Sequence, residues 1–116
     1  MLPVEFAEFS RRFEVGFLVW IKDEAPTMRR CDFHITTEKI GITPMEYDPL
    51  RLPQAGSKVA LVFANPWYTE RCEMGVVRGV LQGEMDSLEI EPWEIIWSVA
   101  WDVEHYPERI IRRWRR

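Results

Sequence analysis

Two short stretches of the sequence are apolar at almost every position, and they limit the folds that the chain can adopt. Residues 15–21 read VGFLVWI, and residues 57–64 read SKVALVFA. Short runs rich in β-branched and aromatic residues are typical of strands that are covered on both faces. They predict two central strands in a sheet that closes, or nearly closes, because closure removes the exposed edges.

The N-terminal segment has the spacing of an amphipathic helix. Phe6, Phe9 and Phe13 recur with charged residues between them, which predicts a helix of about two to three turns whose aromatic stripe lies against the sheet. Alternation of apolar and polar residues predicts further strands at residues 27–35, 39–43 and 71–83. Glycines at four-residue spacing in the last of these indicate a bend, a bulge or a close approach.

The C-terminal third carries a second pattern with helical spacing. Trp93, Ile96, Trp97 and Ala100 follow Pro92, which predicts a helix within residues 89–100, before a last strand at residues 101–111. Prolines in residues 44–56 exclude a long helix there, although a turn of helix beginning at Asp48 fits. We therefore expect a mainly β, six-stranded, mostly antiparallel barrel with an N-terminal helix and a helix before the last strand. A two-sheet sandwich is the competing architecture.

The composition bounds the class of protein. A chain of 116 residues suits one domain, residues 1–116, and a net charge of −4 does not suggest a general polyanion binder. We expect a cytoplasmic protein with no membrane or nucleic-acid partner, because no basic leader or long apolar run is present and the five arginines after residue 108 read as a solvated end. Six Trp and six Phe are many for so small a core, which predicts a homodimer.

One set of residues suggests that an anion binds. Arg29 and Arg30 lie in the middle of a predicted strand, Thr43 ends the next strand, and Arg51 and Lys58 flank the proline-rich crossover. Guanidinium groups and a hydroxyl suit a phosphate group. The competing interpretation is that each side chain points to solvent or pairs with a nearby carboxylate.

The sequence offers little local evidence of catalysis. It contains none of the motifs GxSxG, GxxxxGK[ST], HExxH or GxGxxG, and its two histidines, His34 and His105, are isolated. Cys31 and Cys72 are far apart and form no CxxC motif, so we expect two buried thiols and no metal site. The catalytic residues, if the chain is an enzyme, remain unknown at this point.

The order of the elements and three short motifs resemble the split-barrel flavoproteins related to pyridoxamine 5'-phosphate oxidase. The motifs are KDEAP at residues 22–26, VVRGV at residues 76–80 and YPERIIRRW at residues 106–114. The resemblance covers residues 5–114 and implies a homodimer with FMN at the subunit interface. It also implies an oxidoreductase of unknown substrate, in which the flavin performs the redox step.

The resemblance implies roles for particular residues. Arg29 or Arg30, Thr43 and Arg51 correspond to the phosphate contacts, Lys58 lies beside them, and Trp67, Trp101 or Trp114 would cover the flavin ring. Family members usually carry a lysine at the start of the crossover, where this chain reads Tyr47-Asp48-Pro49. A barrel that has lost the cofactor and serves as a binding or assembly module is therefore the alternative. An unrelated barrel that binds a nucleotide or haem is the third hypothesis.

Overall fold

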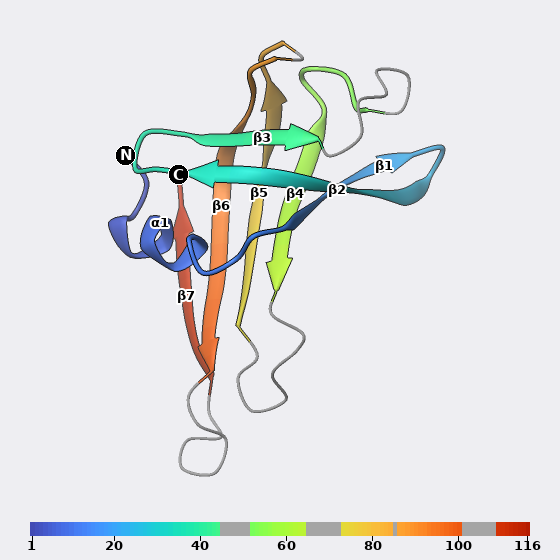
Figure 1. Ribbon diagram of the computed structural model, residues 1–116. Coiled ribbons are helices and arrows are strands. Elements are labelled where there is room, and N and C mark those ends of the chain that lie inside the picture. The colour runs from blue at the N-terminus through green and yellow to red at the C-terminus, as the bar shows by residue number, and fades with distance from the viewer. Residues whose placement is uncertain (45–51, 65–72, 85, 101–108) are drawn as a thin grey trace.

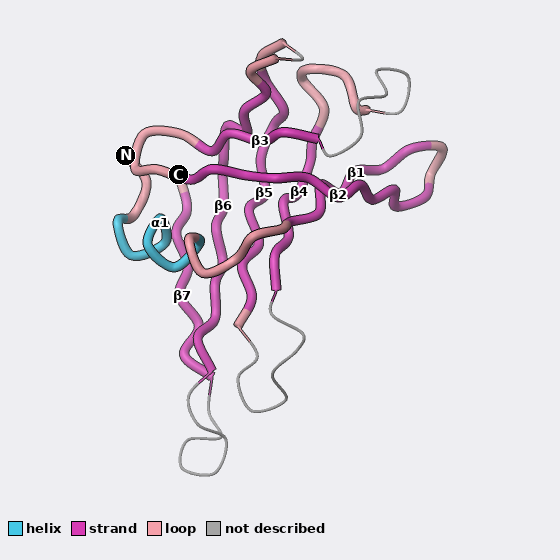
Figure 2. Tube along the Cα trace, in the orientation of Figure 1, coloured by secondary structure: helices cyan, strands magenta, loops and turns pink. Residues whose placement is uncertain are grey.

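The computed structural model describes residues 1–44, 52–64, 73–84, 86–100 and 109–116 (Figure 1). They form one helix and seven strands joined by loops and turns, which Figure 2 distinguishes by colour. The elements are α1 (Val4–Ser10), β1 (Gly16–Lys22), β2 (Ala25–Ile35), β3 (Ile40–Pro44), β4 (Lys58–Ala64), β5 (Met74–Gln82), β6 (Leu88–Ala100) and β7 (Arg109–Arg115). The mainly β fold and its N-terminal helix are confirmed.

Six of the strands close into a ring of antiparallel pairs. The strand order is β3-β2-β1-β4-β5-β6-β7, and β3 also pairs with β6, through residues 40–42 and 88–90. The predicted six-stranded, mostly antiparallel barrel is therefore confirmed, although the strand that completes the ring is β6, which was not predicted, and β7 lies outside the ring as a seventh strand. The strands β1–β3 run across the direction of β4–β7 (Figure 1).

Strand β6 is the element at which the barrel splits. Its first residues pair with β3, whereas Glu94–Ala100 pair with Arg115–Arg109 of β7 on the same edge. The barrel is thus closed by β3 at one end of β6 and extended by β7 at the other. The last strand covers Arg109–Arg115 rather than residues 101–111, of which residues 101–108 lie outside the described residues.

The predicted helix within residues 89–100 is wrong, because this segment belongs to β6. A β-bulge explains the misleading pattern: Arg78 is opposite Glu94 and Gly79 is opposite Pro92, which leaves Trp93 without a partner on β5. Residues 88, 90 and 92 face inward before the bulge, and residues 95 and 97 face inward after it. This change of phase produced apolar spacings that mimic a helix.

Phe63, which is fully buried, is the centre of an aromatic cluster inside the barrel. Its ring centroid lies 4.8–6.1 Å from those of four other phenylalanines, Phe6, Phe9, Phe13 and Phe33. Phe6 and Phe9 belong to α1, so the predicted packing of the helix against the sheet is confirmed for these two residues, whereas Phe13 lies beyond the end of the helix at Ser10.

Two glycines of β5 are positions of close approach, as their spacing predicted. A Cβ atom at Gly75 would collide with the Phe63 ring, and a Cβ atom at Gly79 would collide with the Glu91 carbonyl oxygen beside the bulge. The predicted turn of helix at Asp48 lies outside the described residues.

Candidate functional site

Strand β2 separates the two arginines that were expected to bind an anion together. Arg29 pairs with Leu18 and is half-buried, whereas Arg30 pairs with Phe17 and is exposed. Successive residues of a strand point to opposite faces of the sheet. A single phosphate on the outer face of the barrel therefore has access to Arg30 but not to Arg29.

Thr43 lies on the same outer face as Arg30, opposite Asp32. It lines a hollow of about 350 Å³ between β2, β3 and the turn that leads into β6. Three carboxylates, those of Asp32, Asp86 and Glu89, line this hollow against one lysine, Lys39. Its excess of negative charge opposes the binding of a phosphate group.

The remaining predicted residues lie elsewhere or outside the described residues. Lys58 begins β4, far from Thr43. The strand pairings place Lys58 level with Ile21 of β1 and Thr43 level with Val15, which is about six residues away, on the order of 20 Å along the strands. Trp114 packs against the core and lines a second hollow, of about 260 Å³, together with Glu91 and Arg116. Arg51, Trp67 and Trp101 fall outside the described residues.

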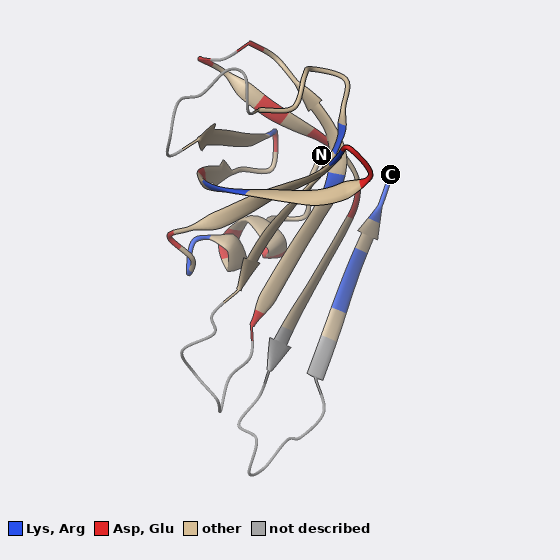
Figure 3. Cartoon of the chain, turned by 90° about the vertical axis from the view of Figure 1, so that its right-hand side faces the viewer, with Lys and Arg blue, Asp and Glu red and all other residues tan. Residues whose placement is uncertain are grey.

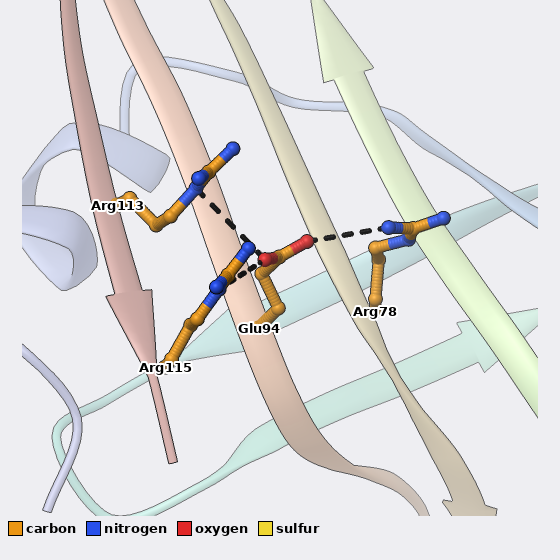
Figure 4. A network of polar contacts seen from close by, with 4 residues as sticks. All are labelled: Arg78, Glu94, Arg113 and Arg115. Atoms are coloured by element: carbon orange, nitrogen blue, oxygen red, sulfur yellow. Dashed lines mark hydrogen bonds and ion pairs between the residues drawn. The ribbon is translucent and has the colours of Figure 1, made fainter.

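The outer face of β5, β6 and β7 carries a cluster that the sequence interpretation missed. The Glu94 carboxylate accepts a hydrogen bond of 2.7 Å from Arg115 Nε and one of 3.3 Å from Arg78 Nη1, and Arg113 Nε lies 3.9 Å away (Figure 4). Glu94 is 7% exposed, whereas the three arginine side chains are 54–65% exposed. We refer to Arg78, Glu94, Arg113 and Arg115 as the arginine cluster.

Register explains how this cluster forms. Arg78, Glu94 and Arg115 lie directly opposite one another on three neighbouring strands, and Arg113 is on the same face of β7 as Arg115. The sequence signal was the i, i+2 spacing of Arg113 and Arg115, which is typical of one strand face. The series of basic residues along β7 is visible in Figure 3.

The arginines keep Glu94 ionised. The hydrogen bond from Arg115 is the largest cause that lowers the pKa of Glu94 below its ordinary value of 4.5, and Arg78 and Arg113 contribute in the same direction against desolvation. Three guanidinium groups therefore face one carboxylate at neutral pH. The cluster has an excess of positive charge, in contrast to the hollow beside Thr43.

An apolar row leads from the arginine cluster across the outer face of the barrel. Phe17, Val62, Val76 and Ile96 lie opposite one another on β1, β4, β5 and β6. Phe17 is 39% exposed, and the other three are half-buried. We refer to these four residues as the outer stripe.

The outer stripe ends at a basic residue on each side. Phe17 is opposite Arg30, and Ile96 is opposite Arg113 of the arginine cluster. The outer faces of antiparallel sheets are commonly polar where they meet water, whereas this part of the outer face is apolar.

Other kinds of site find little support in the described part of the chain. No group of three or more His, Cys, Asp or Glu side chains in these residues is arranged to hold a metal ion. Burial, with a smaller contribution from Asp32, raises the pKa of the Cys31 thiol to about 12, although a hydrogen bond with the backbone of Leu18 opposes this shift. Cys31 is thus not a nucleophile at neutral pH. No helix in the described residues is long and apolar enough to cross a membrane.

The fold is similar to that of a solved structure, the FAD-binding protein from Mycobacterium smegmatis. The TM-score is 0.62 at 15% sequence identity, and the match covers 99% of this chain and 96% of that chain. No protein-family model matches the sequence, and no curated protein sequence is similar to it. The two chains therefore share a fold over almost their whole lengths, and membership of the pyridoxamine 5'-phosphate oxidase family stays a prediction.

Proposed function

We propose that this chain is a flavin-binding protein and that it binds the flavin on the outer face of the barrel. The observation that carries the proposal is the outer stripe, an apolar row that ends at an excess of positive charge. A flavin nucleotide suits both features, since its flat ring system has apolar faces and an apolar dimethylbenzene end, and its side chain carries phosphate. The shared fold with an FAD-binding protein supports this class of cofactor.

We further propose that two copies of the chain enclose the flavin between them. Cofactor sites bury most of the surface of their ligand in a concave pocket. The outer stripe belongs to the convex side of the barrel, and the lining residues of the two hollows do not include it. A second copy placed over the stripe would supply the missing wall and would also cover Phe17, which is exposed in the single chain.

The nature of the flavin and its chemistry are parts of this proposal. The resemblance in the sequence favours FMN, and the structural neighbour binds FAD, so both are candidates. A bound flavin would supply redox chemistry, and the protein would position its ring and phosphate and exclude water. An oxidoreductase of unknown substrate follows as the proposed activity. The resemblance on its own implies other contacts: Arg29 or Arg30, Thr43 and Arg51 for the phosphate, and one of Trp67, Trp101 and Trp114 for the ring.

A visible absorption spectrum tests the flavin proposal directly. The purified chain is measured before and after incubation with FMN, FAD or riboflavin, followed by removal of the free flavin. We expect retained flavin absorbance and quenched flavin fluorescence. A protein that stays colourless with all three flavins would overturn the proposal, and a colourless dimer would favour the cofactor-less assembly module.

Sedimentation tests the dimer independently of the flavin. We expect a dimer at micromolar concentration, and Val76→Glu in the middle of the outer stripe should convert it to a monomer with unchanged far-ultraviolet circular dichroism. Gln82→Glu is the matched control, because Gln82 is exposed at the end of the same strand. A wild-type monomer at this concentration contradicts the proposal.

A further inference from the structure

We infer that the arginine cluster binds the phosphate or diphosphate of the ligand that lies on the outer stripe. This inference rests on the proposed function, and it assigns the phosphate to Arg78, Arg113 and Arg115 rather than to the residues that the sequence singled out. The geometry of the arginines, their charge and their distance from the outer stripe all favour a phosphate there.

Within the described residues, the geometry leaves donors of the three arginines free for a ligand. A guanidinium group has five N–H donors, and Glu94 takes one hydrogen bond from Arg115 and one from Arg78. The three arginine side chains are each more than half exposed. Glu94 therefore holds the guanidinium groups beside one another while each keeps N–H donors that Glu94 does not use. Such preorganisation reduces the entropy lost when the arginines bind an anion.

The charge of the cluster favours an anion, although one carboxylate is present. Three guanidinium groups face the single carboxylate of Glu94, and its lowered pKa keeps that carboxylate ionised and paired. In the hollow beside Thr43, three carboxylates oppose one lysine. A phosphate group is thus attracted to the outer face of β5–β7. It is repelled from the hollow lined by Thr43, the residue that the sequence suggested as a phosphate contact.

The cluster lies within reach of a ring on the outer stripe. Arg113 is directly opposite Ile96 of the stripe, and Arg78 follows Val76 by two residues on the same face of β5. Two residues of a strand span about 7 Å. A ring stacked on Val76 and Ile96 can therefore extend a short polyol chain and its phosphate to the arginines.

A purely structural role is the competing explanation. Within the described residues β7 pairs only with β6, and charged side chains on an edge strand prevent pairing with other chains. In that case the arginines would affect aggregation or stability and would not affect the affinity for phosphate. The experiment must therefore separate binding of the phosphate from binding of the ring.

Flavin fluorescence titrations with FMN and riboflavin make this separation, because riboflavin lacks only the phosphate. We expect the wild-type protein to bind FMN at least tenfold more tightly than riboflavin, with a difference that shrinks as salt is added. Arg78→Gln and Arg113→Gln should each weaken FMN binding about tenfold and leave riboflavin binding unchanged. Arg11→Gln, on an exposed residue just after α1, is the matched control for loss of one arginine charge.

The other outcomes have definite meanings. Equal affinity of the wild type for FMN and riboflavin would overturn the inference, as would loss of FMN affinity in Arg30→Gln without loss in the two cluster variants. If no flavin binds, the proposed function fails, and calorimetric titration with pyrophosphate then tests the anion site alone. Binding that Arg78→Gln and Arg113→Gln weaken supports the site, and absence of pyrophosphate binding by the wild type refutes it.

Discussion

The packing of Phe63 over Gly75 permits a quantitative test of how tightly β4 and β5 pack inside the barrel. A methyl group at Gly75 would collide with the Cζ and Cε atoms of the Phe63 ring, which are the atoms that leucine lacks. Overpacking a dense core costs about 1–3 kcal/mol. Against this, replacing glycine by alanine in a strand gains roughly 0.5–1 kcal/mol. We expect Gly75→Ala to lower the free energy of unfolding by about 1–2 kcal/mol on balance.

The double variant is the informative one. Phe63→Leu alone should cost about 1–2 kcal/mol, which is less than the ~3–5 kcal/mol typical of Phe→Ala. In Phe63→Leu/Gly75→Ala the new methyl group occupies space that the ring has left, so the two costs should not add. We expect the double variant to be at least about 1 kcal/mol more stable than the sum of the single effects predicts. Urea unfolding followed by circular dichroism measures all four proteins, and additive effects would refute the proposed contact.

Three further predictions concern other parts of the barrel. In a Cys72→Ser background, Cys31 should resist alkylation by iodoacetamide at pH 8 until urea unfolds the protein. The reason is that the raised pKa of Cys31 keeps its thiol protonated and its burial keeps the thiol covered. Rapid alkylation of the native protein would contradict this prediction. Glu94→Gln should destabilise the protein at pH 7, and the difference in stability from wild type should shrink as the pH falls below 4.5. A carboxylate with a lowered pKa stabilises the fold above its ordinary pKa and loses that effect as it is protonated. Urea unfolding midpoints at pH 7 and pH 3 measure the difference, and an equal difference at both pH values would count against the prediction. Gly79→Ala should lower the free energy of unfolding by about 2 kcal/mol or more, because its methyl group would meet backbone atoms beside the bulge. Gly41→Ala, where the nearest atom would lie 3.7 Å away, should lower it by less than about 1 kcal/mol. Thermal unfolding measures both variants, and equal losses of stability would contradict the prediction.

Much of the fold could be predicted because most strands follow simple alternation. The two apolar stretches became β1 and β4, as predicted, but cover on both faces was wrong, because only the inner face of each strand is buried. The outer faces carry Phe17 and Val62 of the outer stripe. Strand β6 was mistaken for a helix because its bulge at Trp93 shifts the alternation by one residue. A bulge depends on which residues of β5 lie opposite, and that pairing is not contained in the local sequence.

The candidate site was harder to predict for the same reason. Arg29 and Arg30 are adjacent in sequence but lie on opposite faces of β2, whereas Arg78 and Arg115 are far apart in sequence but meet at Glu94. Closeness in sequence therefore does not predict which basic residues share a face of the sheet. The register of β5, β6 and β7 decides which basic residues share a surface.

The split of β6 between β3 and β7 links the architecture to the proposed function. If β3 paired with the whole of β6, no edge would remain for β7, and Arg113 and Arg115 would not lie beside the outer stripe. The additional strand extends the sheet and lines the end of the apolar row with guanidinium groups. The same strand offers a charged edge that discourages indiscriminate pairing. A surface that is apolar in the middle and basic at its margins would then select a partner of matching chemistry, namely a flat ring that carries phosphate and the second copy of the chain that covers it.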